Sequence, residues 1–212
     1  MKTLAATACL LALFLLPAPA MADRQAILLD YMPSGRIIRV EDDVRYWVGG
    51  KDRLEGQYYV ETVVGELRRI IPRLPFRQVS SASQANVRIY LTDSHEEWQE
   101  TIAKSAEGMA GWEEIGHLIR GFTRTVTSPG GSVRRADVVL HLDFQTSGGQ
   151  KLWIVRHEFM HALGVMHHPT ATQDSVLNSM QEQHDKNSEF SDTDILVLQT
   201  MYGPGASPGG AW

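Results

Sequence analysis

Hydrophobic and polar residues follow two different periods along this chain of 212 residues. Alternating or β-branched runs predict five strands, at 44–48, 76–79, 87–91, 122–127 and 136–143. Apolar spacings of three and four, together with capping residues, predict helices over 55–74, from 94 toward 107, over 150–163 and from Ser191 to Gly203. This order of elements predicts one domain of the α+β class, or of the closely related α/β class.

The helix over 55–74 has the clearest pattern. Its apolar side chains would line one buried face: Val60, Val63, Val64, Leu67, Ile70, Ile71 and Leu74. Pro72 and Pro75 end the helix, because proline cannot continue the backbone hydrogen bonding. By contrast, residues 165–189 show no period, as is typical of a long functional loop.

The first 22 residues have the pattern of a signal peptide. Lys2 is followed by an apolar run, Leu4–Leu16, that is too short to span a bilayer, and then by the small-x-small site Ala20-Met21-Ala22. We therefore expect an exported protein, secreted or periplasmic, that is cleaved after Ala22. No later run approaches the length of a membrane span. The remaining chain divides into a lead-in segment at 23–39, a domain at 40–203 and a flexible tail at 204–212.

Composition and charge exclude several classes of protein. Hydrophobic residues make up 43% and charged residues 21%, a balance typical of a globular domain rather than a disordered chain. The net charge of −5 offers no basic excess for a nucleic-acid partner. The single cysteine, Cys9, lies in the expected signal peptide, which excludes a disulfide within the chain and a cysteine-based metal site.

The segment 157–167 has the residues of a metal site. His157 and His161 are one helical turn apart, so both rings can bind the same ion, and Glu158 can reach a water on that ion. Gly164 can end the helix with a positive φ and let the chain return, which would bring His167 to the ion as the third ligand. The neighbouring His168 is off this spacing, so we take His167. Three neutral imidazoles leave a fourth tetrahedral position open, as in catalytic zinc sites.

The pattern H-E-x-x-H-x-x-G-x-x-H resembles the signature of metzincin zinc peptidases. Flanking segments are similar to the catalytic domain of matrixins, so the resemblance spans residues 40–203: Val44–Val48, Leu74–Val79, Ala85–Tyr90, Ala136–Leu140 and Asp194–Gly203. The resemblance implies a single metzincin-type domain. Its mixed, twisted sheet would be accompanied by an N-terminal helix, a zinc-binding active-site helix and a C-terminal helix.

The resemblance also implies the activity of a zinc-dependent endopeptidase. Glu158 would act as the general base toward a zinc-activated water, and the strand 122–127 would lie at the sheet edge and bind a peptide or protein substrate. The alternative is a non-catalytic zinc-stabilised module that binds peptides or proteins on the same fold. The intact Glu158 favours the enzyme.

Other family features have less clear counterparts. A methionine turn is expected beneath the zinc, and Met180 is the candidate that we favour over Leu177, which lies in the similar segment 174–178. We expect one catalytic zinc ion. His141 resembles a fragment of a second metal site, but a strand-end role is the simpler interpretation, and no calcium loop is evident.

Cleavage of the signal peptide is directly testable. We expect the mature protein to begin at Asp23 and to be found in an exported fraction. Intact-mass measurement of the protein from each cell fraction checks this. A cytoplasmic protein that retains Met1 would contradict it.

Overall fold

The computed structural model describes residues 21–51, 53–92, 94, 96–97, 100, 120–142, 147–170, 174–178 and 189–212. The expected signal peptide therefore lies outside the described residues, except for Met21 and Ala22. Only four residues of the helix expected from 94 onward are described. At its start the Glu97 backbone N–H donates to Ser94 Oγ at 3.3 Å, which is the hydrogen bond expected of a capping serine.

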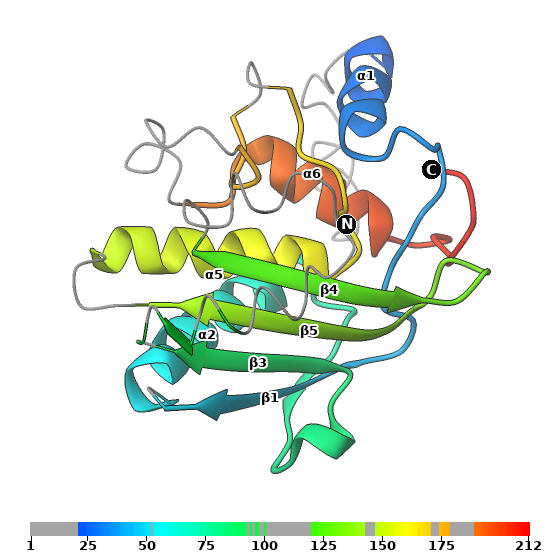
Figure 1. Cartoon of the computed structure of the whole chain (residues 1–212). Helices are drawn as coiled ribbons and strands as arrows, with labels where there is room; N and C mark the ends of the chain where they lie inside the picture. Colours follow the sequence, from blue (N-terminus) through cyan, green and yellow to red (C-terminus); the bar gives the residue numbers. More distant parts are fainter. Residues whose placement is uncertain are drawn as a thin grey trace, which may run out of the picture.

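A five-stranded mixed sheet forms the centre of the fold (Figure 1). The strands lie in the order β2-β1-β3-β5-β4, with bounds β1 Val44–Gly50, β2 Phe76–Gln78, β3 Val87–Thr92, β4 Gly121–Thr127 and β5 Val133–His141. Neighbouring strands are parallel except for β4, which runs antiparallel to β5. The prediction that this strand lies at the edge of the sheet is confirmed for the described strands.

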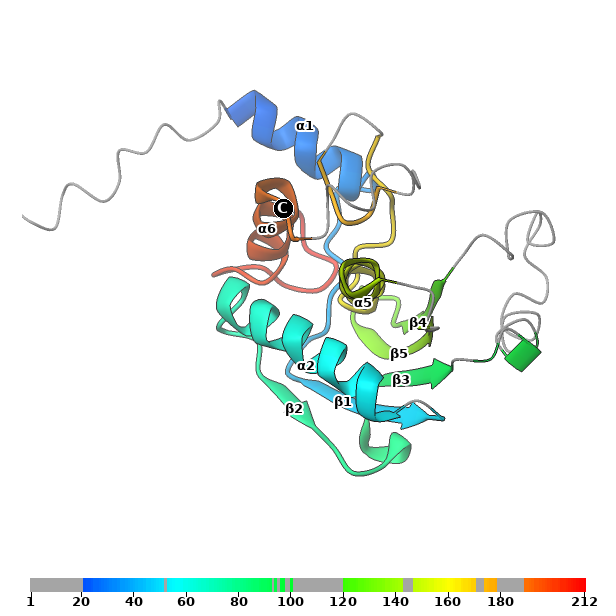
Figure 2. The same ribbon diagram turned by 90° about the vertical axis from the view of Figure 1, so that its left-hand side faces the viewer.

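Two helices, α2 (Arg53–Ile70) and α5 (Gly148–Ala162), pack on the same face of the sheet (Figures 1 and 2). Side chains alternate along β1, and Val44, Tyr46 and Val48 are buried toward these helices. The C-terminal helix α6 (Asp192–Met201) and the N-terminal helix α1 (Met21–Tyr31) complete the described helices. The predicted α+β class, with a mixed sheet and helices before, at and after the histidine segment, is confirmed. Among the described residues, no helix is long and apolar enough to cross a bilayer.

Helix α2 is shorter than its apolar pattern. The helix ends at Ile70, although the pattern continues to Leu74. Ile71 and Leu74 are still buried, because the chain turns at Pro72 and keeps both side chains against the core. The periodic pattern thus marks the buried residues correctly, while proline decides where the backbone hydrogen bonds stop.

The lead-in segment and the C-terminal segment make contacts that the sequence does not indicate. The lead-in segment contains α1, whose Leu28 and Tyr31 are buried; too few of its residues are apolar for a clear helical period. The segment expected as a flexible tail packs beside residues 36–39 in this structure. There, Ile37 donates to Gly210 O and Gly209 donates to Ile37 O, at 2.9 and 2.8 Å. Short backbone pairings of this kind leave almost no hydrophobic pattern in the sequence.

Helix α5 is fixed to α2 by buried charge. The Arg156 guanidinium donates two hydrogen bonds to the Glu66 carboxylate, at 2.8 and 2.7 Å, and its side chain is 5% exposed. Lys151 on the same helix contacts Glu55 on α2. A bidentate pair between two helices sets their relative position, and so it fixes the helix that carries His157 and His161.

We therefore expect Arg156→Ala to destabilise the fold. The substitution leaves Glu66 without its bidentate partner, and the loss of one member of such a pair costs about 3 kcal/mol. For a domain of this size we expect the Tm to fall by roughly 6–12 °C, measured by calorimetry. Arg69→Ala, at an exposed position of α2, is the matched control and should change stability by less than about 0.5 kcal/mol. Equal Tm values for the two variants would contradict the role of the pair.

Candidate metal centre

Two histidines of α5 face the same point in space. His157 Nε2 and His161 Nε2 are 3.2 Å apart, as expected from their spacing on the helix. The opposite nitrogen of each ring contacts a backbone carbonyl: His157 Nδ1 lies 2.9 Å from Val176 O, and His161 Nδ1 lies 2.6 Å from Val165 O. A carbonyl only accepts, so each Nδ1 carries the proton and each neutral ring presents a lone pair at Nε2.

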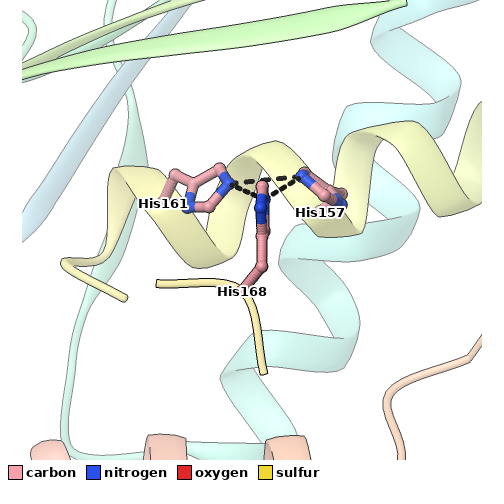
Figure 3. Close-up of side chains that lie close together, drawn as sticks. All are labelled: His157, His161 and His168. Atoms are coloured by element: carbon pink, nitrogen blue, oxygen red, sulfur yellow. Dashed lines mark hydrogen bonds between the residues drawn. The ribbon is translucent and has the colours of Figure 1, made fainter. Parts of the chain in front are cut away.

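The third histidine of the cluster is His168. Its Nε2 atom lies 3.2 Å from both other Nε2 atoms, and the three nitrogens form a nearly equilateral triangle (Figure 3). His167 does not belong to the cluster. The expectation that His167 completes the set is thus corrected by the structure, which brings His168 to the pair instead.

The chain geometry after the helix explains the difference. Gly164 has a φ of 110° and turns the chain, as expected, and a side chain at this position would overlap with Ile38 O. Beyond Gly164 the backbone carbonyl of Val165 accepts from the His161 ring, and Met166 Sδ lies 3.5 Å from Thr125 Oγ1 on β4. A loop has no fixed period, and in this loop it is the residue after His167 that reaches the other two histidines.

The donor set fits a tetrahedral metal ion. With metal–nitrogen bonds near 2.05 Å and tetrahedral angles, two ligand nitrogens lie about 3.3 Å apart. The observed separations of 3.2 Å match this value. Without a cation, the lone pairs of His157 and His161 would face each other across a distance at which neither ring can donate. Within the described residues, these three histidines form a group whose nitrogen atoms lie close enough together to hold one metal ion.

Burial favours the neutral, metal-binding form of His161 and His168. It lowers the pKa of His161 to about 4, partly opposed by the contact with Val165 O, and the charge of His168 lowers it further. Burial, followed by the charge of His167, also lowers the pKa of His168. Imidazoles that stay neutral at physiological pH keep Nε2 available as a ligand.

Glu158 occupies an enclosed position between α5 and β4. The residue is 4% exposed, and its carboxyl Oε2 accepts a hydrogen bond from Thr123 Oγ1 at 2.6 Å. Burial raises the pKa of this carboxyl to about 8, and the hydrogen bond from Thr123 acts in the opposite direction. Sequence reasoning did not identify Thr123, because a contact between residues this far apart in the chain leaves no local pattern.

The turn at 174–178 supports the first histidine. Its Val176 carbonyl accepts from the His157 ring, while the Val176 N–H donates to Asp194 Oδ2 at 3.0 Å. Ser175 and Tyr31 donate to the other oxygen of Asp194, at 2.7 and 3.2 Å. Asp194 also forms a capping box with Ser191 at the start of α6, which the sequence does predict. The same carboxylate therefore begins a helix and holds the turn that orients a candidate ligand.

Leu177 lies in this supporting turn and is fully buried. It follows directly after Val176, which contacts the His157 ring. The favoured candidate for the methionine turn, Met180, lies outside the described residues. His141, the remaining histidine considered as a ligand, is buried at the end of β5, where its Nδ1 lies 2.7 Å from Arg120 Nη1.

Comparison with known proteins identifies the family. The profile of DUF2927, described as a protein of unknown function, matches residues 23–211. The chain belongs to this family. The part of the chain that matches DUF2927 runs from α1 to the packed C-terminal segment and includes both the histidine cluster and its supporting turn.

A search of curated proteins returned no match. Among solved structures, the DUF2927 chain is similar to that of myroilysin, with 15% sequence identity and a TM-score of 0.49. The similarity covers 79% of this chain and 98% of that chain.

The two adjacent histidines provide a sharp test of the ligand set. His168→Ala removes one corner of the nitrogen triangle, so zinc affinity should fall by more than the ten- to hundredfold that is typical of outer-shell changes. His167→Ala, the matched neighbour, should keep the affinity within about threefold, because the His167 ring is not part of the nitrogen cluster. Competition with a chromogenic chelator at neutral pH measures both. If His167→Ala loses zinc and His168→Ala does not, His167 would be the third ligand, as the sequence predicts.

Proposed function

We propose that this protein is an exported zinc-dependent endopeptidase. The observation that carries the proposal is the triangle of three Nε2 atoms, together with the buried carboxyl group of Glu158, the residue that directly follows the first histidine in the sequence. Three protein ligands leave a fourth position for water or substrate, which distinguishes a catalytic zinc site from a closed structural one. The proposed ligands are His157, His161 and His168.

A zinc ion in this site would act as a Lewis acid that polarises a peptide carbonyl and lowers the pKa of water. The protein supplies the remaining functions. His157 and His161 are held in the ligand tautomer by Val176 and Val165. The positive charge of a bound zinc ion would favour the ionised form of Glu158 against the effect of burial. In that form Glu158 would accept the proton of the attacking water and pass it to the leaving amine. Because Glu158 is 4% exposed, bulk water is largely kept away from its carboxyl during this transfer.

The edge strand β4 offers a binding surface for the substrate backbone. β4 pairs with β5 on one side and forms the edge of the described sheet on the other. An extended peptide would add to this edge as a further strand, with main-chain hydrogen bonds giving affinity. Thr123 on β4 contacts Glu158 directly, so a peptide on this strand would pass close to the proposed base.

Glu158→Gln separates catalysis from metal binding. The substitution keeps the volume of the side chain but removes the proton acceptor, so peptide cleavage should fall by about a hundred- to ten-thousandfold. Zinc content, measured by atomic absorption, should stay at one ion per chain. The circular dichroism spectrum should match that of the wild type, because the fold is unchanged. Cleavage is measured with a fluorogenic peptide library.

His161→Ala is the contrasting variant, since it should lose zinc and activity together. Wild-type rates in Glu158→Gln would contradict the mechanism. A wild-type protein that holds zinc but cleaves no peptide in the library would favour the binding-module alternative.

A further inference from the structure

Two residues of β4 enclose the side chain of Glu158. Thr123 Oγ1 lies 2.6 Å from Oε2 and 3.2 Å from the Glu158 backbone carbonyl. Gly121 faces the other carboxyl oxygen: a Cβ atom at this position would lie 2.5 Å from Oε1 and 2.6 Å from Cγ. Gly121 does not have a positive φ, so the glycine is required by space and not by backbone conformation.

We propose that Thr123 and Gly121 are positioning residues that hold Glu158 in one orientation. The proposal rests on the function proposed for Glu158 above. Residues two apart on a strand point to the same face, so β4 presents both groups to α5 at once. One supplies a donor for Oε2, and the other supplies the space that Oε1 fills. Among the described residues, Thr123 is the one that hydrogen-bonds the carboxyl.

The chemistry of a general base explains why Glu158 needs positioning residues. Glutamate has several rotatable bonds, and a buried carboxyl without a fixed partner can adopt several rotamers. A base must lie within hydrogen-bond reach of the proton that it removes. A displacement of about 1 Å can cost a hundredfold in rate. Threonine suits this task on a strand, because its β-branched side chain has restricted χ1 rotamers and places the hydroxyl reproducibly.

Thr123→Val is the first test, because it removes the hydroxyl and keeps the shape. We expect kcat to fall about ten- to a hundredfold, with KM and zinc content nearly unchanged. Thr123→Ser restores the hydroxyl and should recover kcat to within about threefold of the wild type. Gly121→Ala should lower kcat like Thr123→Val, because its Cβ displaces Oε1. An unchanged kcat in Thr123→Val would overturn the proposal.

Thr62→Val is the matched control. Thr62 lies on α2, and its hydroxyl donates to the Tyr58 carbonyl at 2.8 Å, so the substitution also removes one hydroxyl hydrogen bond. Its kcat should equal that of the wild type. A fall in kcat as large as that of Thr123→Val would show a general effect of the substitution and overturn the proposal.

A double-mutant cycle shows whether Thr123 acts through Glu158. In the Glu158→Gln background, Thr123→Val should cause little further loss, because the group that it positions is already inactive. Equal losses in both backgrounds would overturn the proposal.

A structural measurement separates this proposal from the proposed function. Crystal structures of the zinc-loaded wild type and of Thr123→Val should show the Glu158 carboxyl in different positions. If the wild type cleaves no peptide, the proposed function fails, and the position of this carboxyl still decides the positioning role. An identical position in both structures would overturn it.

Discussion

Three imidazole nitrogens at mutual distances of 3.2 Å are unfavourable unless a cation lies among them. The lone pairs of His157 and His161 point toward the same position, because the protons of both rings are held by backbone carbonyls on the far side. Much of the surrounding structure maintains this arrangement. The carbonyl of Val165 accepts from the His161 ring and the carbonyl of Val176 accepts from the His157 ring, while the turn at Gly164 returns the chain and brings in His168.

Support for the site extends well beyond the histidines. The pair of Arg156 and Glu66 sets the position of α5 against α2, and α5 carries two of the three rings. Asp194 holds the turn that contains Val176, and through it the His157 ring. Backbone carbonyls and buried charge therefore hold the two rings of α5 in position. Such outer contacts are a general requirement of metal sites, because they orient the ligands before the ion binds.

Regular periods allowed much of this structure to be predicted from the sequence. The helical spacing of His157 and His161 and the burial pattern of α2 agree with expectation. The edge position of β4 also agrees, although it was expected from the resemblance to matrixins and not from a period. The third ligand position did not follow from sequence, because the loop after Gly164 has no period that separates His167 from His168. The contacts of Thr123 and Gly121 with Glu158 were not predicted either, since they arise only from the packing of β4 on α5.

The two ends of the family domain meet at one carboxylate. Tyr31 of α1 and the turn at 174–178 both donate to Asp194 at the start of α6. During synthesis, a chain that has not yet reached α6 contains all three histidines but lacks the acceptor that orients the turn beneath His157. The turn that orients the His157 ring is thus completed only by α6, so the proposed metal site would depend on a chain that is folded through its last helix.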